Sequence, residues 1–188
     1  MRIAVLGAGG LGGYLGAVLY EAGHEVVLVT RGEHFDVIAE RGLEVSEGGR
    51  VRRVLVPCSL GSDLDGQFDI AFVTVKTYAL ETIAPLAAHL ARRGAAIIPL
   101  VNGVDASELL SREAGDRVTP GVAYVTAFRT RPGTVERIGT HQRLVFGPHT
   151  TLPGGQSLLE AAFAETPVDI EVVSDVRPEL WRKMAVVC

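Results

Sequence analysis

Residues 1–16 read MRIAVLGAGGLGGYLG, and this stretch decides the fold of the chain. A short apolar run, typical of a buried strand, leads into Gly7, Gly9 and Gly12 at the G-x-G-x-x-G spacing. Gly7 permits a tight exit from the strand, Gly9 leaves the backbone open to a pyrophosphate, and Gly12 lets the next helix pack closely. The free N–H groups at that helix N-terminus attract phosphates. The stretch therefore predicts a dinucleotide-binding turn, and a glycine-rich turn that only packs a helix is the alternative.

The composition restricts the class of protein. The chain has 188 residues, of which 47% are hydrophobic, so it is long and apolar enough to form one domain with a core. Its formal net charge of −4 argues against a general nucleic-acid binder. Its apolar runs are too short to span a bilayer or to form a secretion signal. We therefore expect a soluble, cytoplasmic protein with neither a nucleic-acid nor a membrane partner.

The cysteines and histidines indicate no metal site. Cys58 and Cys188 lie far apart and have neither C-x-x-C nor zinc-ligand spacing, so reduced thiols are expected. The five histidines are scattered, and surface positions are expected for all of them: His24, His34, His89, His141 and His149.

Strands alternate with helices over the first 112 residues. Apolar runs predict strands at 26–29, 70–75 and 95–101, helical periodicity predicts helices at 34–41, 80–91 and 106–112, and a hairpin is expected at 43–56. This alternation predicts an α/β fold with a doubly wound parallel sheet.

The pattern changes after residue 120. Strands are predicted at 122–128, 134–138 and 143–146, separated by the turns Arg131-Pro132-Gly133 and Gly139-Thr140. Connections this short predict antiparallel pairing. A helix at 157–164 and a strand at 170–173 follow, and an apolar helix that carries Trp181 begins at Pro178. This last helix predicts either a partner that covers it or a longer chain.

Arg31 comes directly after the second predicted strand. Proteins that prefer NAD carry an acidic residue near this point, which binds the ribose 2′-hydroxyl, whereas an arginine suits the 2′-phosphate of NADP. Arg31 therefore favours NADP, although Glu33 is nearby and a solvated surface arginine is the alternative.

Three further polar residues are candidates for the site. Lys76 and Asn102 follow two successive parallel strands, and the ligand crevice of a doubly wound sheet lies outside those strand ends. The alternatives are an exposed lysine at a helix start and a turn former beside Gly103. Lys183 on the last helix, considered alone, is typical of a solvated lysine.

Several stretches together resemble the ketopantoate reductases (2-dehydropantoate 2-reductases). The resemblance extends over nearly the whole chain. Its marks, besides the glycine motif and Arg31, are TVKTYALETIAPL (74–86), PLVNGVD (99–105), GVAYVTAFRTRPGTVERIG (121–139) and ELWRKMAVVC (179–188). The resemblance implies a Rossmann-like sheet with added antiparallel strands and then a helical C-terminal domain. It also implies NADPH-dependent reduction of a 2-oxo acid to a 2-hydroxy acid in pantothenate synthesis.

The resemblance also assigns roles to residues. Lys183 becomes the catalytic lysine, with Lys76 and Asn102 lining the cofactor and substrate crevice. The residues expected to bind NADP are Gly7, Gly9, Gly10, Leu11, Gly12, Arg31, Lys76 and Asn102. Residues 1–176 are then the NADP-binding domain, and residues 177–188 are the first turns of a truncated helical substrate domain.

One position departs from the family. Val187 stands four residues after Lys183, where the family usually has a substrate-binding asparagine, so the substrate can be a 2-oxo acid other than ketopantoate. A non-catalytic NADP-binding module, or a fragment that needs a partner, is the competing hypothesis. The apolar last helix favours a homodimer formed through it.

Overall fold

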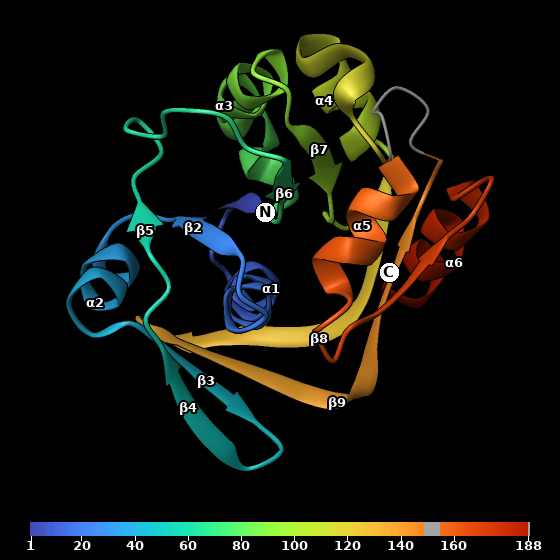
Figure 1. The fold of residues 1–188 in the computed structure, drawn as a ribbon. Coiled ribbons are helices and arrows are strands. Elements are labelled where there is room, and N and C mark those ends of the chain that lie inside the picture. Colours follow the sequence, from blue (N-terminus) through green and yellow to red (C-terminus); the bar gives the residue numbers. More distant parts are fainter. Residues whose placement is uncertain (149–154, 188) are drawn as a thin grey trace.

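A computed structural model describes residues 1–148 and 155–187. Its first sheet is parallel and has the strand order β5-β2-β1-β6-β7, with β1 in the centre (Figure 1). The strands are β1 (Arg2–Leu6), β2 (Glu25–Val29), β5 (Cys58–Ser59), β6 (Ile70–Val73) and β7 (Ala96–Pro99). The two-residue strand β5 is too short to show any periodicity, so the sequence pattern does not predict it.

Helices cover both faces of this sheet, as the alternation of elements predicted. Ile3 and Val5 of β1 belong to one core, with α1 (Gly10–Glu21) and α5 (Gly155–Phe163). Ala4 and Leu6 belong to the other core, with α3 (Leu80–Arg92) and α4 (Ala106–Ala114). Because successive strand residues point to opposite faces, a strand covered on both faces is apolar throughout, which explains the continuous run in β1.

A second sheet lies across α1. It comprises β3 (Leu43–Glu47), β4 (Arg50–Val54), β8 (Gly121–Arg131), β9 (Thr134–Phe146) and β10 (Asp169–Val172). Its order is β10-β9-β3-β4, and β8 also pairs with β9. Figure 1 shows α1 between the first sheet and the long strands β8 and β9. All eight α1 residues from Gly12 to Leu19 are therefore buried, which explains why the helix is apolar on every side.

The prediction of separate strands at 134–138 and 143–146 is wrong, because β9 is one strand. Gly139 has a φ of 77°, and the pairing with β8 passes from Val125–Gln142 to Thr126–Ile138. Gly139 and Thr140 therefore belong to a bulge and not to a chain-reversing turn. The expected antiparallel pairing holds for β8 with β9, whereas β3 and β10 pair with β9 in parallel. The hairpin predicted at 43–56 is confirmed as β3–β4.

Helix α6 (Arg177–Val187) packs on β8. The Tyr124 hydroxyl donates a hydrogen bond to Glu179 Oε2 at 2.8 Å, and Leu180 packs against a small core that contains Val122 and Val176. The outer face of α6 is open, with Trp181 62% exposed. Among the residues that the structure describes, no helix has the length and apolar character needed to cross a membrane.

Candidate functional site

The loop between β1 and α1 has the geometry that its glycines predicted. Gly7 has a φ of 110°, in the left-handed region. A Cβ atom on Gly12 would lie 2.1 Å from the Gly7 carbonyl oxygen, so only glycine lets α1 begin this close to the loop. A Cβ atom on Gly9 would have no neighbour within 4 Å, so the space beside the loop is open. In the described part of the chain no side chain caps α1 at Gly9, which leaves its first N–H groups available to an anion.

Gly10 has a packing role that the motif alone does not reveal. A Cβ atom on Gly10 would lie 2.1 Å from the Ala127 carbonyl oxygen and 2.6 Å from Phe128 Cα. Strand β8 therefore crosses directly over the N-terminus of α1. Residues of β8 far along the chain are thereby placed beside the glycine loop.

Lys76 and Asn102 follow neighbouring strands at the carboxyl edge of the first sheet, as predicted. Strand β6 ends at Val73 and β7 at Pro99, so both residues lie in the loops and not at the strand ends themselves. Both side chains are exposed. The Thr77 hydroxyl donates a hydrogen bond to the Asn102 carbonyl oxygen at 3.3 Å, which ties the segment that begins at Lys76 to the Asn102 loop.

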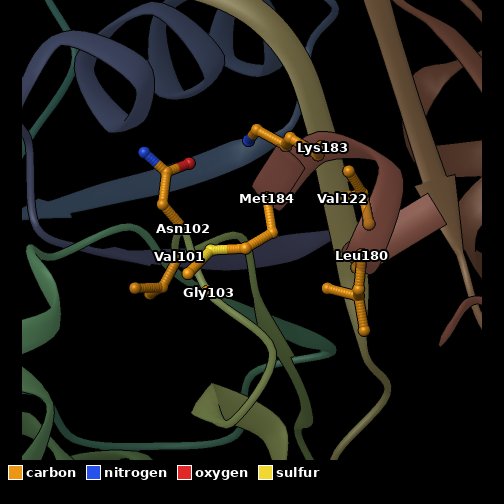
Figure 2. A pocket seen from close by; sticks show the side chains of 8 residues that line it. Val101, Asn102, Gly103, Val122, Leu180, Lys183 and Met184 are labelled. Carbon is orange, nitrogen blue, oxygen red and sulfur yellow. The ribbon is translucent and has the colours of Figure 1, made fainter. Parts of the chain in front are cut away.

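Lys183 and Asn102 line one pocket, although they are 81 positions apart in the sequence. The pocket lies between α6, β8 and the loop after β7, and its other walls include Val122, Leu180 and Met184. Figure 2 shows the polar ends of Lys183 and Asn102 on the same side of the pocket. Lys183 is half-buried, and this burial lowers the pKa of its ammonium group. Lys76 does not line this pocket.

Arg31 lies in a second hollow. This hollow is formed by the segment from Arg31 to His34 and by residues 129–132 of β8 and its turn. Arg31, Arg129 and Arg131 all line it, so the region beside the end of β2 is strongly basic.

The prediction of surface positions for the histidines is wrong for His34, which is 3% exposed. His24 and His89 are partly buried, His141 is exposed, and His149 lies outside the described residues. The sequence signal for His34 was weak, because the groups that bury it come from the glycine loop and from the turn after β8.

Cys58 is a free thiol, and Cys188 also lies outside the described residues. In the described ranges no three His, Cys, Asp or Glu side chains form a possible metal site.

A central parallel sheet with helices on both faces and a glycine-rich β1–α1 loop defines a Rossmann-type protein. The sequence pattern of the ketopantoate reductases PanE/ApbA matches residues 3–151. The chain belongs to this family.

Individual relatives and solved structures are also similar to this chain. The 2-dehydropantoate 2-reductase of Caulobacter vibrioides is 30% identical over 99% of this chain and 61% of its own length. The crystal structure of the PanE/ApbA family ketopantoate reductase from Ralstonia eutropha JMP134 is 31% identical, with a TM-score of 0.86 over 97% of this chain and 60% of that one. D-mandelate dehydrogenase, solved with NADH and anilino(oxo)acetate, shares the fold with a TM-score of 0.89 at 23% identity, over 97% of this chain and 60% of that one. The chain thus spans about 60% of the length of these relatives.

Proposed function

We propose that this chain is the cofactor-binding part of an NADPH-dependent reductase that converts a 2-oxo acid to a 2-hydroxy acid. The observation that carries the proposal is the pocket in which Lys183 approaches Asn102 at the carboxyl edge of the parallel sheet. The names of the relatives, 2-dehydropantoate 2-reductase above all, support this reaction class.

The residues present fit a dinucleotide. The open space beside Gly9 and the uncapped start of α1 suit a pyrophosphate, which Gly7, Gly9, Gly10, Leu11 and Gly12 would hold. Arg31 would bind the 2′-phosphate that distinguishes NADP from NAD. The nicotinamide, when bound, supplies the hydride.

Lys183 is suited to act as the general acid. Reduction of a carbonyl places negative charge on its oxygen, and an ammonium group can both stabilise that charge and donate the proton. Because burial lowers the pKa of Lys183, its Nζ gives up a proton more readily than that of a solvated lysine. Asn102 would orient the substrate and the cofactor ribose, and Lys76 would steady the carboxylate or carbonyl of the substrate.

The identity of the 2-oxo acid depends on the last helix. Ketopantoate is the substrate that the relatives' names suggest. Position 187 of α6, one helical turn after Lys183, carries valine, which cannot hydrogen-bond a substrate hydroxyl. A different 2-oxo acid is therefore part of the proposal. Residues 177–188 would be the first turns of the helical substrate domain, following a cofactor domain at 1–176.

The exposed face of α6 supports a second candidate, a binding module that gains the rest of its site from a partner. Trp181 is 62% exposed and Val186 is 82% exposed. Apolar side chains in this position on a surface helix suit a protein interface. A second copy of the chain, forming a homodimer through α6, is the partner proposed here.

NADPH oxidation by the 188-residue chain, measured with ketopantoate and a panel of other 2-oxo acids, tests the proposal. NADH is run in parallel, and binding of both cofactors is measured in the same samples. Turnover supports the reductase and identifies its substrate by the highest kcat/KM. NADPH binding without turnover favours the binding module, and failure to bind either cofactor contradicts both candidates.

A further inference from the structure

The basic hollow beside Arg31 contains more positive charge than Arg31 alone supplies. Its charged and titratable side chains are Arg31, Glu33, His34, Arg129 and Arg131. Three arginines and one glutamate thus line the hollow. The imidazole adds no charge, because both of its nitrogens already have partners that suit the neutral ring.

The three arginines differ in how far they are already engaged. Arg131 donates hydrogen bonds to Glu44 Oε1 at 2.7 Å and to Thr134 Oγ1 at 3.0 Å. Within the described ranges, neither Arg31 nor Arg129 forms a salt bridge. Arg31 and Arg129 are therefore the two cations in this hollow that remain available to a bound anion.

The hollow adjoins the glycine loop on two sides. The amide groups of Gly7 and Ala8 both donate to the Val29 carbonyl oxygen, at 3.0 and 3.1 Å, and Val29 is two residues before Arg31. On the other side, the contact between Gly10 and Ala127 fixes β8 against α1, two residues before Arg129. The two arginines are thus attached to the loop through separate strands, β2 and β8.

From this placement we propose that Arg129 is a second determinant of cofactor choice, which binds the 2′-phosphate together with Arg31. The inference rests on the proposed function and deepens it. A phosphate monoester carries nearly two negative charges at neutral pH, and planar guanidinium groups match its oxygens in bidentate geometry. Two free arginines neutralise this charge better than one. The ribose 2′-hydroxyl of NADH is uncharged, so neither arginine gains an ion pair with it.

The test measures binding and not turnover. Dissociation constants for NADPH, NADH and 2′-AMP are determined by calorimetry for the parent chain, for Arg129→Gln and for Arg131→Gln. Arg131→Gln is the matched control, because it removes the same charge from the same hollow but from a side chain already held by Glu44. The same dissociation constants are measured for Arg129→Lys, which keeps the charge at this position but loses the bidentate geometry.

We expect Arg129→Gln to weaken the binding of NADPH and of 2′-AMP about tenfold, as for one lost charge-assisted contact. The affinity for NADH should stay nearly unchanged. The NADPH affinity of Arg129→Lys should lie between that of the parent and that of Arg129→Gln. Arg131→Gln should keep the parent's preference for NADPH over NADH. If Arg129→Gln weakens the binding of NADPH and of NADH equally, or keeps the parent's full preference for NADPH, the role of Arg129 is overturned but the NADPH assignment is not. A parent chain that binds neither dinucleotide, or that binds NADPH no tighter than NADH, overturns the NADPH assignment together with it.

Discussion

His34 Nε2 lies 2.7 Å from the carbonyl oxygen of Ala8, in the middle of the glycine loop. On the other side of the ring, Nδ1 accepts a hydrogen bond from the Gly133 amide at 2.8 Å. Both contacts are satisfied only when the ring is neutral and carries its proton on Nε2, a tautomer that follows from the hydrogen-bond network. One imidazole in α2 (Glu33–Arg41) thereby joins the glycine loop to the turn between β8 and β9.

This contact predicts that stability falls in mild acid. Burial lowers the pKa of His34, and the nearby charge of Arg129 lowers it further, although the bond to Ala8 opposes both. A histidine whose pKa is lower in the folded state contributes its stability above the unfolded pKa of about 6.5, and loses it as the pH falls from there toward the folded value. Urea unfolding between pH 8 and pH 5 should show this loss.

The variant His34→Gln should flatten that part of the pH profile. It should also lower the free energy of unfolding at pH 8 by about 1–3 kcal/mol, as for a buried group left without its partner. His141→Gln is the control, because His141 is exposed. An identical acid-dependent loss in His34→Gln and in the parent would show that His34 does not cause it.

Gly9→Ala and Gly12→Ala should separate cofactor binding from folding. The Gly12 Cβ position is 2.1 Å from the Gly7 carbonyl oxygen, so Gly12→Ala should lower Tm and weaken NADPH binding together. The Gly9 position is open and has a φ of −70°, so Gly9→Ala should keep the parent Tm. Its methyl group should obstruct the pyrophosphate and so weaken NADPH binding at least about tenfold. Thermal unfolding and NADPH titration test the pair. Unchanged NADPH affinity in Gly9→Ala would contradict the use of this loop for the cofactor.

Much of the fold and part of the candidate site could be predicted from the sequence, because they depend on local patterns. The glycine spacing and the apolar run Ile3–Leu6 describe a strand, a turn and a helix without reference to any distant residue. The bulge at Gly139 could not be predicted, because a glycine with positive φ serves a turn and a bulge equally well. Only the neighbouring strand, β8, decides between them.

The residues that local sequence patterns could not place at the candidate site depend on contacts between distant segments. His34 is buried by Ala8 and Gly133, the second of which is 99 positions away. Arg129 is typical of a surface strand residue until β8 is placed over Gly10. Lys183 lines the same pocket as Asn102 only because α6 packs on β8. No spacing rule connects these pairs, so only the family resemblance could indicate the last of them.

The hydroxyl of Tyr14 predicts a loss of stability at high pH. This fully buried residue of α1 is hydrogen-bonded to Gln142 and to Glu47 Oε1, the latter at 3.2 Å. Burial first, and then the charge of Glu47 and its hydrogen bond, raise the pKa of Tyr14 to about 12. The stability that neutral Tyr14 contributes is complete below its unfolded pKa of about 10 and is lost as the pH rises toward the folded value.

Tyr14→Phe tests this by removing only the hydroxyl. It should lower the free energy of unfolding by about 1–3 kcal/mol at pH 8, since Glu47 and Gln142 each lose a partner, and the difference from the parent should shrink above pH 10. Tyr78→Phe is the control, because Tyr78 is 86% exposed. Equal stability of Tyr14→Phe and the parent at pH 8 would rule out a stabilising role for this hydroxyl.

Lys183→Ala should separate turnover from cofactor binding. If Lys183 donates the proton, its removal should lower kcat by about 10²–10⁴-fold and leave NADPH affinity nearly intact. Because burial lowers the pKa of Lys183, the rate of the parent should begin to fall with rising pH below the range of a solvated lysine, and Lys183→Ala should lose this limb of the profile. Arg182→Ala is the matched control, since Arg182 is exposed and paired with Glu179 on the same helix. The comparison is made by measuring NADPH oxidation from pH 6 to pH 10 and NADPH binding for each variant. Equal losses of rate in both variants would mean that α6 contributes packing and not a proton.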